Sequence, residues 1–220
     1  MFLTLLKKEL IMELRSKQMV LSMLVFALSI ILIIALSSNV SKVILMNYSP
    51  GLFWLMNLFI VTLAVHRSFF YEKEFDAFTL LLSSPADRGT IFFAKWMSGV
   101  VFISITQLIL FIPFFKLLIL DIPQNYFGFL LGSLLVNFAI MAVASLVSGV
   151  VVRSNYSDIL LPILLFPLLS PLMIAATKIS ENIINQSPLT EWNVWILIVA
   201  SVIIIFGLSG YTLFEYVVEE

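Results

Sequence analysis

The chain has 220 residues and a net charge of −1, and 61% of its residues are hydrophobic while only 11% are charged. Soluble domains carry roughly 25% charged residues, so this composition excludes a water-soluble fold. Several apolar runs exceed the ~18 residues that mark a membrane-spanning helix. We therefore predict an all-α integral membrane protein that forms a single transmembrane domain over residues 1–220. Cysteine is absent, which excludes disulfides and thiolate metal sites.

Residues 1–18 are the first predicted element. Leu3, Leu6, Leu10 and Leu14 follow a helical spacing, with Lys8 roughly opposite. We interpret this pattern as an interfacial helix that lies along the membrane before the first span. An ordinary polar flank of that span is the alternative, and the leucine spacing favours the interfacial helix.

Six membrane spans are predicted next, at residues 19–36, 43–65, 91–118, 126–152, 158–177 and 194–214. Each span must be helical because the hydrocarbon core offers no partners for backbone hydrogen bonds. In the second span, Pro50 and Gly51 indicate a bend at the entry. Pro162, Pro167 and Pro171 loosen the fifth span, where a hinge and a static kink remain equally compatible with the sequence.

Charged residues gather in the segment 66–90, between the second and third spans. Within it, Phe75, Phe78, Leu81 and Leu82 lie on one helical face, and Pro85 ends the patch. We predict a short cytoplasmic coupling helix that docks into a partner protein through the following residues: Glu74, Phe75, Asp76, Phe78, Leu81, Leu82 and Pro85. The alternative is a helix that dips into lipid, but acidic flanks are poorly placed beside anionic headgroups.

Lysine and arginine are distributed unevenly between the two sides of the predicted membrane. One side holds nine of them: Lys7, Lys8, Arg15, Lys17, Arg67, Lys73, Arg88, Lys95 and Arg153. The other side holds three, namely Lys42, Lys116 and Lys178. Because basic residues concentrate in cytoplasmic segments, we predict that both termini and the 66–90 segment are cytoplasmic.

The spans carry little chemistry. The sequence lacks a Walker A pattern, a glycine-rich dinucleotide turn and a His-x-x-x-His pair. Its one histidine, His66, is better interpreted as an interfacial polar residue than as a haem or metal ligand. Asn57, Gln107 and Asn137 lie at mid-membrane depth and are interpreted as hydrogen-bond partners between helices. A membrane enzyme normally displays clustered titratable groups, so we expect a non-catalytic subunit.

The order of these elements resembles that of ABC-2-type permeases. The resemblance rests on the run from Glu74 to Pro85 followed by Lys95 before the third span. More specific signals are Ser49-Pro50-Gly51-x-x-Trp54, then Leu63-Ala64 with Arg67, and Phe166-Pro167-Leu168-x-x-Pro171-Leu172-x-Ile174-x-Ala176-Thr177. Together they are similar to the haem exporter permease subunits of cytochrome c maturation, the CcmB family.

This resemblance implies a permease subunit of the bacterial inner membrane that couples ATP hydrolysis in a separate subunit to haem export or to release of a haem-loaded chaperone. The implied partners are a second copy of the chain, the cytoplasmic ATPase CcmA, the haem-handling membrane protein CcmC with its small helper CcmD, and the haem chaperone CcmE. Nucleic acid is not an implied partner. ATP would bind the partner subunit, the complex would handle haem, and this chain would bind no cofactor itself.

Two other functions are compatible with parts of the pattern. An ABC-2-type permease that exports a drug, a lipid or a polysaccharide would share the six spans and the coupling helix. A membrane-embedded enzyme or a channel would belong to a different class, and the lack of titratable clusters within the spans disfavours it.

Labelling of single cysteines tests the predicted orientation. The chain has no cysteine of its own, so in the Ser84→Cys and Ser187→Cys variants the introduced thiol is the only group that the reagent can label. An impermeant thiol reagent added outside intact cells should label the Ser187→Cys chain, whereas the Ser84→Cys chain should react only after the membrane is opened. Labelling of Ser84→Cys from outside, with Ser187→Cys protected, would reverse the orientation.

Overall fold

The computed structural model describes residues 1–37, 41–74, 87–152, 154 and 156–219. Over these ranges the secondary structure is helical, with seven α-helices and one 3-10 helix. Their bounds are α1 Phe2–Ser16, α2 Gln18–Ser37, α3 Lys42–Glu74, α5 Arg88–Leu117, α6 Tyr126–Val151, α7 Ser157–Ile184, η1 Leu189–Glu191 and α8 Asn193–Glu219.

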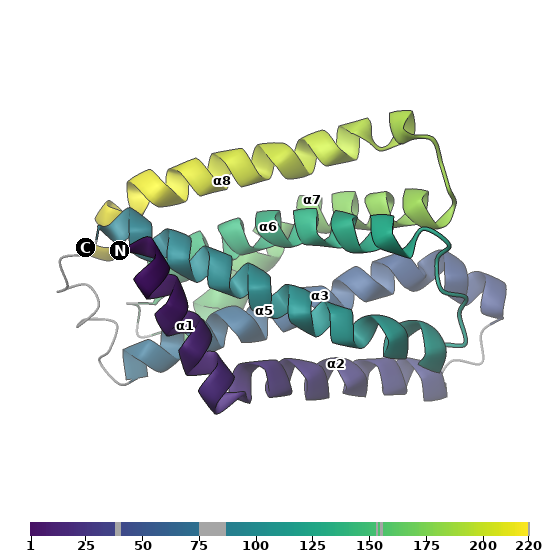
Figure 1. The fold of residues 1–220 in the computed structure, drawn as a ribbon, viewed down its shortest axis with the longest axis horizontal. Helices are drawn as coiled ribbons and strands as arrows, with labels where there is room; N and C mark the ends of the chain where they lie inside the picture. The colour runs from purple at the N-terminus through teal and green to yellow at the C-terminus, as the bar shows by residue number, and fades with distance from the viewer. Residues whose placement is uncertain (38–40, 75–86, 153, 155, 220) are drawn as a thin grey trace.

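Six of these helices, from α2 to α8, are long and apolar enough to cross a membrane, which confirms the predicted number of spans. They lie side by side as an elongated bundle, and both chain ends are at the same end of it (Figure 1). Helix α1 differs because it crosses this end of the bundle obliquely (Figure 1). Its contact with lipid stays a prediction.

The helices extend beyond several predicted span limits. Helix α3 continues past residue 65 to Glu74, so His66 and Arg67 lie on a helix rather than in a loop. Pro50 lies inside the same helix and is buried. Helix α7 runs to Ile184 and contains all three of its prolines within one assigned helix. The structure therefore shows a helix through the prolines, and the choice between a hinge and a static kink stays open.

Helix α6 occupies the centre of the bundle and packs against α3, α5, α7 and α8. Its interior positions carry small side chains, all buried, which let neighbouring helices approach closely: Ala142, Ala144, Ser145, Ser148 and Gly149. Larger side chains fill the remaining space, including a cluster of phenylalanine rings on α3, α5 and α6 around Phe53, Phe114 and Phe129.

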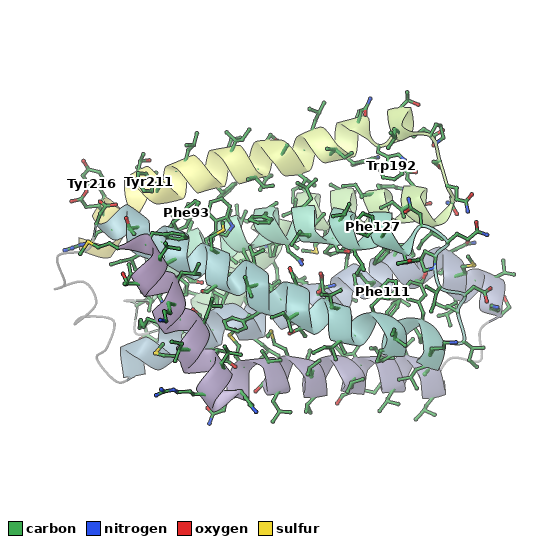
Figure 2. All side chains as sticks on the ribbon, viewed as in Figure 1. Phe93, Phe111, Phe127, Trp192, Tyr211 and Tyr216 are labelled. Atoms are coloured by element: carbon green, nitrogen blue, oxygen red, sulfur yellow. The ribbon has the colours of Figure 1, made fainter. Side chains whose placement is uncertain are left out.

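Aromatic residues also occur at both ends of the bundle. Tyr211 and Tyr216 lie at the end that holds the termini, and Phe127 and Trp192 lie at the opposite end (Figure 2). Two such levels are typical of the two interfaces of a membrane.

Polar side chains join the spans in the interior. Asn137 of α6 donates to the Gln107 side-chain oxygen of α5 at 2.7 Å, as the sequence predicts. The Trp54 indole of α3 donates to the Ser180 hydroxyl of α7 at 2.8 Å. Asn57 departs from the prediction, because its amide nitrogen bonds to the Phe53 carbonyl of its own helix at 3.2 Å. The Asn137–Gln107 and Trp54–Ser180 bonds join different helices and hold these spans in register.

Glycines set the contact between α8 and the rest of the bundle. A Cβ at Gly207 would lie 2.8 Å from the Trp96 ring of α5, and one at Gly149 would lie 2.5 Å from the Phe214 ring of α8. At Gly210, a Cβ would collide with the Phe92 ring, which is completely buried. Close approach of the backbones, rather than an unusual backbone angle, therefore requires glycine at these positions.

We expect Gly210→Leu to force α8 away from α5. Overpacking a filled interior costs about 1–3 kcal/mol, so the free energy of unfolding should fall by that amount. Thr212→Leu is the matched control because Thr212 is an exposed position on the same helix. Thermal unfolding in detergent measures both variants, and equal melting temperatures for the two would contradict the close α5–α8 contact.

Candidate functional site

The structure describes only one of the seven predicted coupling residues. Glu74 is the last helical residue described before the gap, at the end of α3. The other six lie outside the described residues: Phe75, Asp76, Phe78, Leu81, Leu82 and Pro85. The short coupling helix consequently stays a prediction, and the described part of the site consists of the helices on either side of it.

Helix α5 begins directly after this gap with a well-defined N-cap. The Asp87 carboxylate accepts hydrogen bonds from the Thr90 backbone N–H at 3.1 Å and from the Thr90 hydroxyl at 3.2 Å. An aspartate at this position satisfies a backbone donor that the helix leaves open, and it stabilises the first turn. The described chain therefore resumes after the gap at a helix start that the Asp87 cap stabilises.

Lys95 lies about two turns into α5 and ties three helices together. Its side chain is only 1% exposed. The ammonium donates to the Ser68 backbone oxygen of α3 at 2.9 Å and to the Glu9 carboxylate of α1 at 3.4 Å. It also lies 4.8 Å from the centre of the Phe69 ring. One buried cation therefore connects α1, the end of α3 and the start of α5.

Lys95, counted above with the basic residues of the cytoplasmic side, is buried within α5. A buried lysine requires a compensating charge, because desolvation of an unpaired ammonium is costly. Glu9, itself only 8% exposed, supplies that charge and is held in addition by Lys8 at 3.1 Å. The pair fixes where α1 crosses α5.

Helix α1 turns only part of its leucine pattern toward the bundle. Leu3 and Leu14 of the leucine pattern are 75% and 64% exposed, and Leu6 is only partly buried. Leu10 of the pattern packs against the buried core. Phe2, whose ring packs edge-on against Phe93 at 5.4 Å, and Glu9 make further contacts. The leucine spacing located the helix correctly, but the buried ion pair determines which face turns inward.

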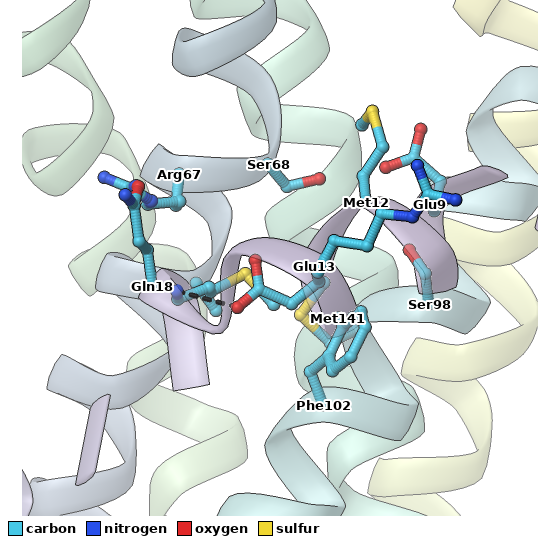
Figure 3. Close-up of a pocket in the computed structure, with 13 residues that line it drawn as sticks. Glu9, Met12, Glu13, Gln18, Arg67, Ser68, Ser98, Phe102 and Met141 are labelled. Carbon is cyan, nitrogen blue, oxygen red and sulfur yellow. Dashed lines mark hydrogen bonds between the residues drawn. The ribbon is translucent and has the colours of Figure 1, made fainter. Parts of the chain in front are cut away.

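The junction between α1 and α2 is a tight corner. Lys17 adopts a left-handed backbone conformation with φ of 54°, and its N–H bonds to the Glu13 carbonyl. The Glu13 carboxylate then accepts the N–H group of Met19 at 2.7 Å (Figure 3). It also accepts the N–H group of Val20 at 3.1 Å, likewise in the first turn of α2. A carboxylate at this place accepts hydrogen bonds from backbone N–H groups that the helix leaves unpaired. Its negative charge also interacts favourably with the positive end of the α2 helix dipole.

A pocket of about 430 Å³ opens beside this corner. It is bounded by α1, the start of α2, the end of α3, the start of α5 and Met141 of α6. Figure 3 shows Glu13 at its centre, with Phe102 and Met141 together on one side and Ser68 on another. Glu9 and Ser68, which accept hydrogen bonds from Lys95, also line the pocket. The pocket therefore lies directly beside the Lys95 contacts.

His66 lies near the same end of the bundle and contacts α7. Its Nε2 is 3.2 Å from the Asp158 carboxylate, and its ring stacks on Phe70 with centroids 4.8 Å apart. Among the described residues, no group of three or more histidine, aspartate or glutamate side chains is arranged to hold a metal ion. His66 thus acts as an exposed contact between α3 and α7.

Sequence reasoning missed the Lys95–Glu9 pair, although each residue carried a signal. Lys95 falls inside the predicted third span, next to Ala94 and Trp96, and a lysine in an apolar run needs a partner. Glu9 lies among leucines in the first helix. Nothing in the sequence, however, states that these two residues, 86 positions apart, meet.

A bundle of six helices that are long and apolar enough to cross a membrane defines a multi-pass membrane protein. A family model described as CcmB protein matches residues 1–212, and the chain belongs to this CcmB family. No curated protein matches the chain. Members of the family are membrane subunits of the ABC transporter for cytochrome c maturation, non-catalytic permease subunits that work with an ATPase partner.

We expect the Lys95–Glu9 pair to behave as a coupled unit in stability measurements. Lys95→Met leaves the buried Glu9 carboxylate with Lys8, 3.1 Å away, as an ion-pair partner. It should cost about 1–3 kcal/mol of unfolding free energy, less than breaking an isolated buried pair. The double variant Glu9→Leu/Lys95→Met removes both charges, so its loss should be clearly smaller than the sum of the two single losses.

Lys42 and Asp121 provide the control. They form an ion pair at 2.8 Å at the other end of the bundle, and both side chains are at least half exposed. Lys42→Met should cost only about 0–1 kcal/mol, as exposed pairs do. Equilibrium unfolding in mixed detergent measures all four variants, and additive losses for Glu9 and Lys95 would show that the two residues do not interact.

Proposed function

We propose that this chain transmits ATP-driven closure of the ATPase CcmA to the membrane spans of the cytochrome c maturation transporter. The coupling segment from Glu74 to Pro85 would dock on the ATPase, with Phe75, Phe78, Leu81 and Leu82 filling an apolar groove and Asp76 facing basic residues at its rim. Transmission would serve haem export or release of the haem-loaded chaperone CcmE.

The Lys95 contacts are the observation that carries this proposal. The coupling segment connects the end of α3 to the start of α5, and Lys95 bonds these two helices to each other and to α1. A force applied between Glu74 and Asp87 would therefore displace three helices together rather than bend one loop. Family membership supports the ATPase as the source of that force.

The remaining partners follow from the same proposal. Two copies of this chain would face a pair of ATPase subunits in the inner membrane, with both termini and the coupling segment in the cytoplasm. CcmC and its helper CcmD would handle haem beside them. ATP would bind only the ATPase, and this chain would hold neither ATP nor haem.

Replacement of Phe78 and Leu81 with aspartate tests the docking. Each buried apolar side chain contributes roughly 1.5–3 kcal/mol, and a charge set against an apolar groove costs more. Recovery of the ATPase with the Phe78→Asp/Leu81→Asp chain should fall by well over tenfold, since about 1.4 kcal/mol is one decade of affinity. A pull-down at matched membrane levels measures recovery, and cells should lose mature c-type cytochromes.

The matched control is Ile119→Asp/Ile122→Asp, the same chemical change in an exposed loop at the opposite end of the bundle. This variant should recover the ATPase normally. Equal recovery from the Phe78/Leu81 variant and the wild type would reject docking through the coupling segment and favour a helix that dips into lipid.

A further inference from the structure

Ile119, just beyond the end of α5, has a backbone conformation that isoleucine rarely adopts. Its φ is 56°, in the left-handed region. Its N–H bonds to the Lys116 carbonyl at 3.2 Å, and the N–H of Leu120 bonds to the Phe115 carbonyl at 2.8 Å. Glycine is the usual residue where a helix closes in this way, because a β-branched side chain strains the left-handed conformation. An isoleucine at this position therefore calls for a compensating interaction.

The described part of the chain leaves the Ile119 side chain largely uncovered. Ile119 is 77% exposed, whereas its neighbours Leu118 and Leu120 are buried and hold the loop against the bundle. Two further apolar side chains of the same segment are also exposed, Leu117 and Ile122. Leu117, Ile119 and Ile122 form what we call the loop patch. Contacts with the described residues do not offset the strain at Ile119, so the compensating interaction has to come from outside them.

The loop patch lies at the level where the spans end. Its loop joins α5 to α6, two of the candidate membrane spans. Phe127 and Trp192 lie at this end of the bundle (Figure 2), and aromatic residues of this kind mark a membrane interface. Asp121 of the same loop pairs with Lys42 at 2.8 Å, and both side chains are at least half exposed. A short loop that exposes both apolar and charged groups suits the boundary between hydrocarbon and water.

We propose that the loop patch inserts into the lipid interface at the end of the bundle opposite the two termini. Burial of the Ile119 side chain among acyl chains offsets the strain of its backbone, an interaction that glycine could not make. Lipid is the occupant because Leu118 and Leu120 keep the loop at the level of the span ends. The inference does not depend on the proposed coupling to the ATPase, which concerns the other end of the bundle.

Spin labels measure this insertion directly. The chain has no cysteine, so a nitroxide can be attached to one introduced thiol at a time. In vesicles of palmitoyl-oleoyl phosphatidylcholine, oxygen concentrates in the hydrocarbon and a nickel chelate stays in water. The ratio of oxygen to nickel accessibility should be severalfold higher for labels at Ile119→Cys and Ile122→Cys than at Thr190→Cys, an exposed polar position in the η1 segment.

Leu108→Cys, at an exposed position within the α5 span, provides the lipid reference, and the ratios at the loop patch should approach its value. Ratios at Ile119→Cys and Ile122→Cys equal to that at Thr190→Cys would place the patch in water and overturn the proposal. Spin–spin broadening at these labels that disappears on dilution with unlabelled chain would assign the patch to a second copy, and would also overturn it.

Ile119→Asn tests whether Ile119 itself holds the loop in lipid. Asparagine tolerates the left-handed conformation, so this variant keeps the backbone and loses the apolar side chain. With the label at Ile122→Cys, the ratio of oxygen to nickel accessibility should fall toward the water reference. Leu189→Asn is the matched control, the same chemical change at an exposed leucine of another loop at this end, and it should leave that ratio unchanged. Equal ratios in the two variants would contradict the role of Ile119.

Discussion

A lysine ammonium that is removed from water must find an opposite charge and hydrogen-bond acceptors, and Lys95 imposes this requirement on three helices. Its acceptors come from the Ser68 carbonyl of α3 and the Glu9 carboxylate of α1. These contacts lie about two turns from the start of α5. Much of the geometry at this end of the bundle follows from this one buried charge.

The position of α1 is the clearest consequence. The leucine spacing alone does not state which side of this amphipathic helix meets the rest of the chain. The Glu9–Lys95 pair selects the rotation that turns Glu9 inward and leaves Leu3 and Leu14 exposed. With α1 held in this way, Glu13 reaches the first turn of α2, and the corner at Lys17 closes one side of the pocket.

The rest of the bundle obeys a different constraint. In hydrocarbon, helices gain little from burying apolar surface, so they associate through close packing and a few hydrogen bonds. Helix α6 accordingly carries small residues at its contacts, and glycines on α6 and α8 receive aromatic rings. Helices α2 and α8 are the least enclosed of the six spans, so the other helices leave much of their surfaces uncovered.

The sequence by itself determined the class of protein, the six spans and the helical first element, because length, hydropathy and helical spacing are local properties. It also carried the resemblance to the CcmB family, through motifs distributed over most of the chain. It could predict that Gln107 and Asn137 bond between helices, because polar groups inside hydrocarbon need partners. The coupling residues from Phe75 to Pro85 stay predictions, since they lie outside the described residues.

Only the tertiary structure decided which distant residues meet. The partner of Lys95 lies 86 positions away, and no periodicity connects the two. Asn57 shows the same limit, since its burial was predictable but its bond to the carbonyl of its own helix was not. The pocket likewise draws its lining from α1, α2, α3, α5 and α6. Contacts of this kind depend on how whole helices cross, and the crossing is set by packing and by the buried Lys95–Glu9 pair.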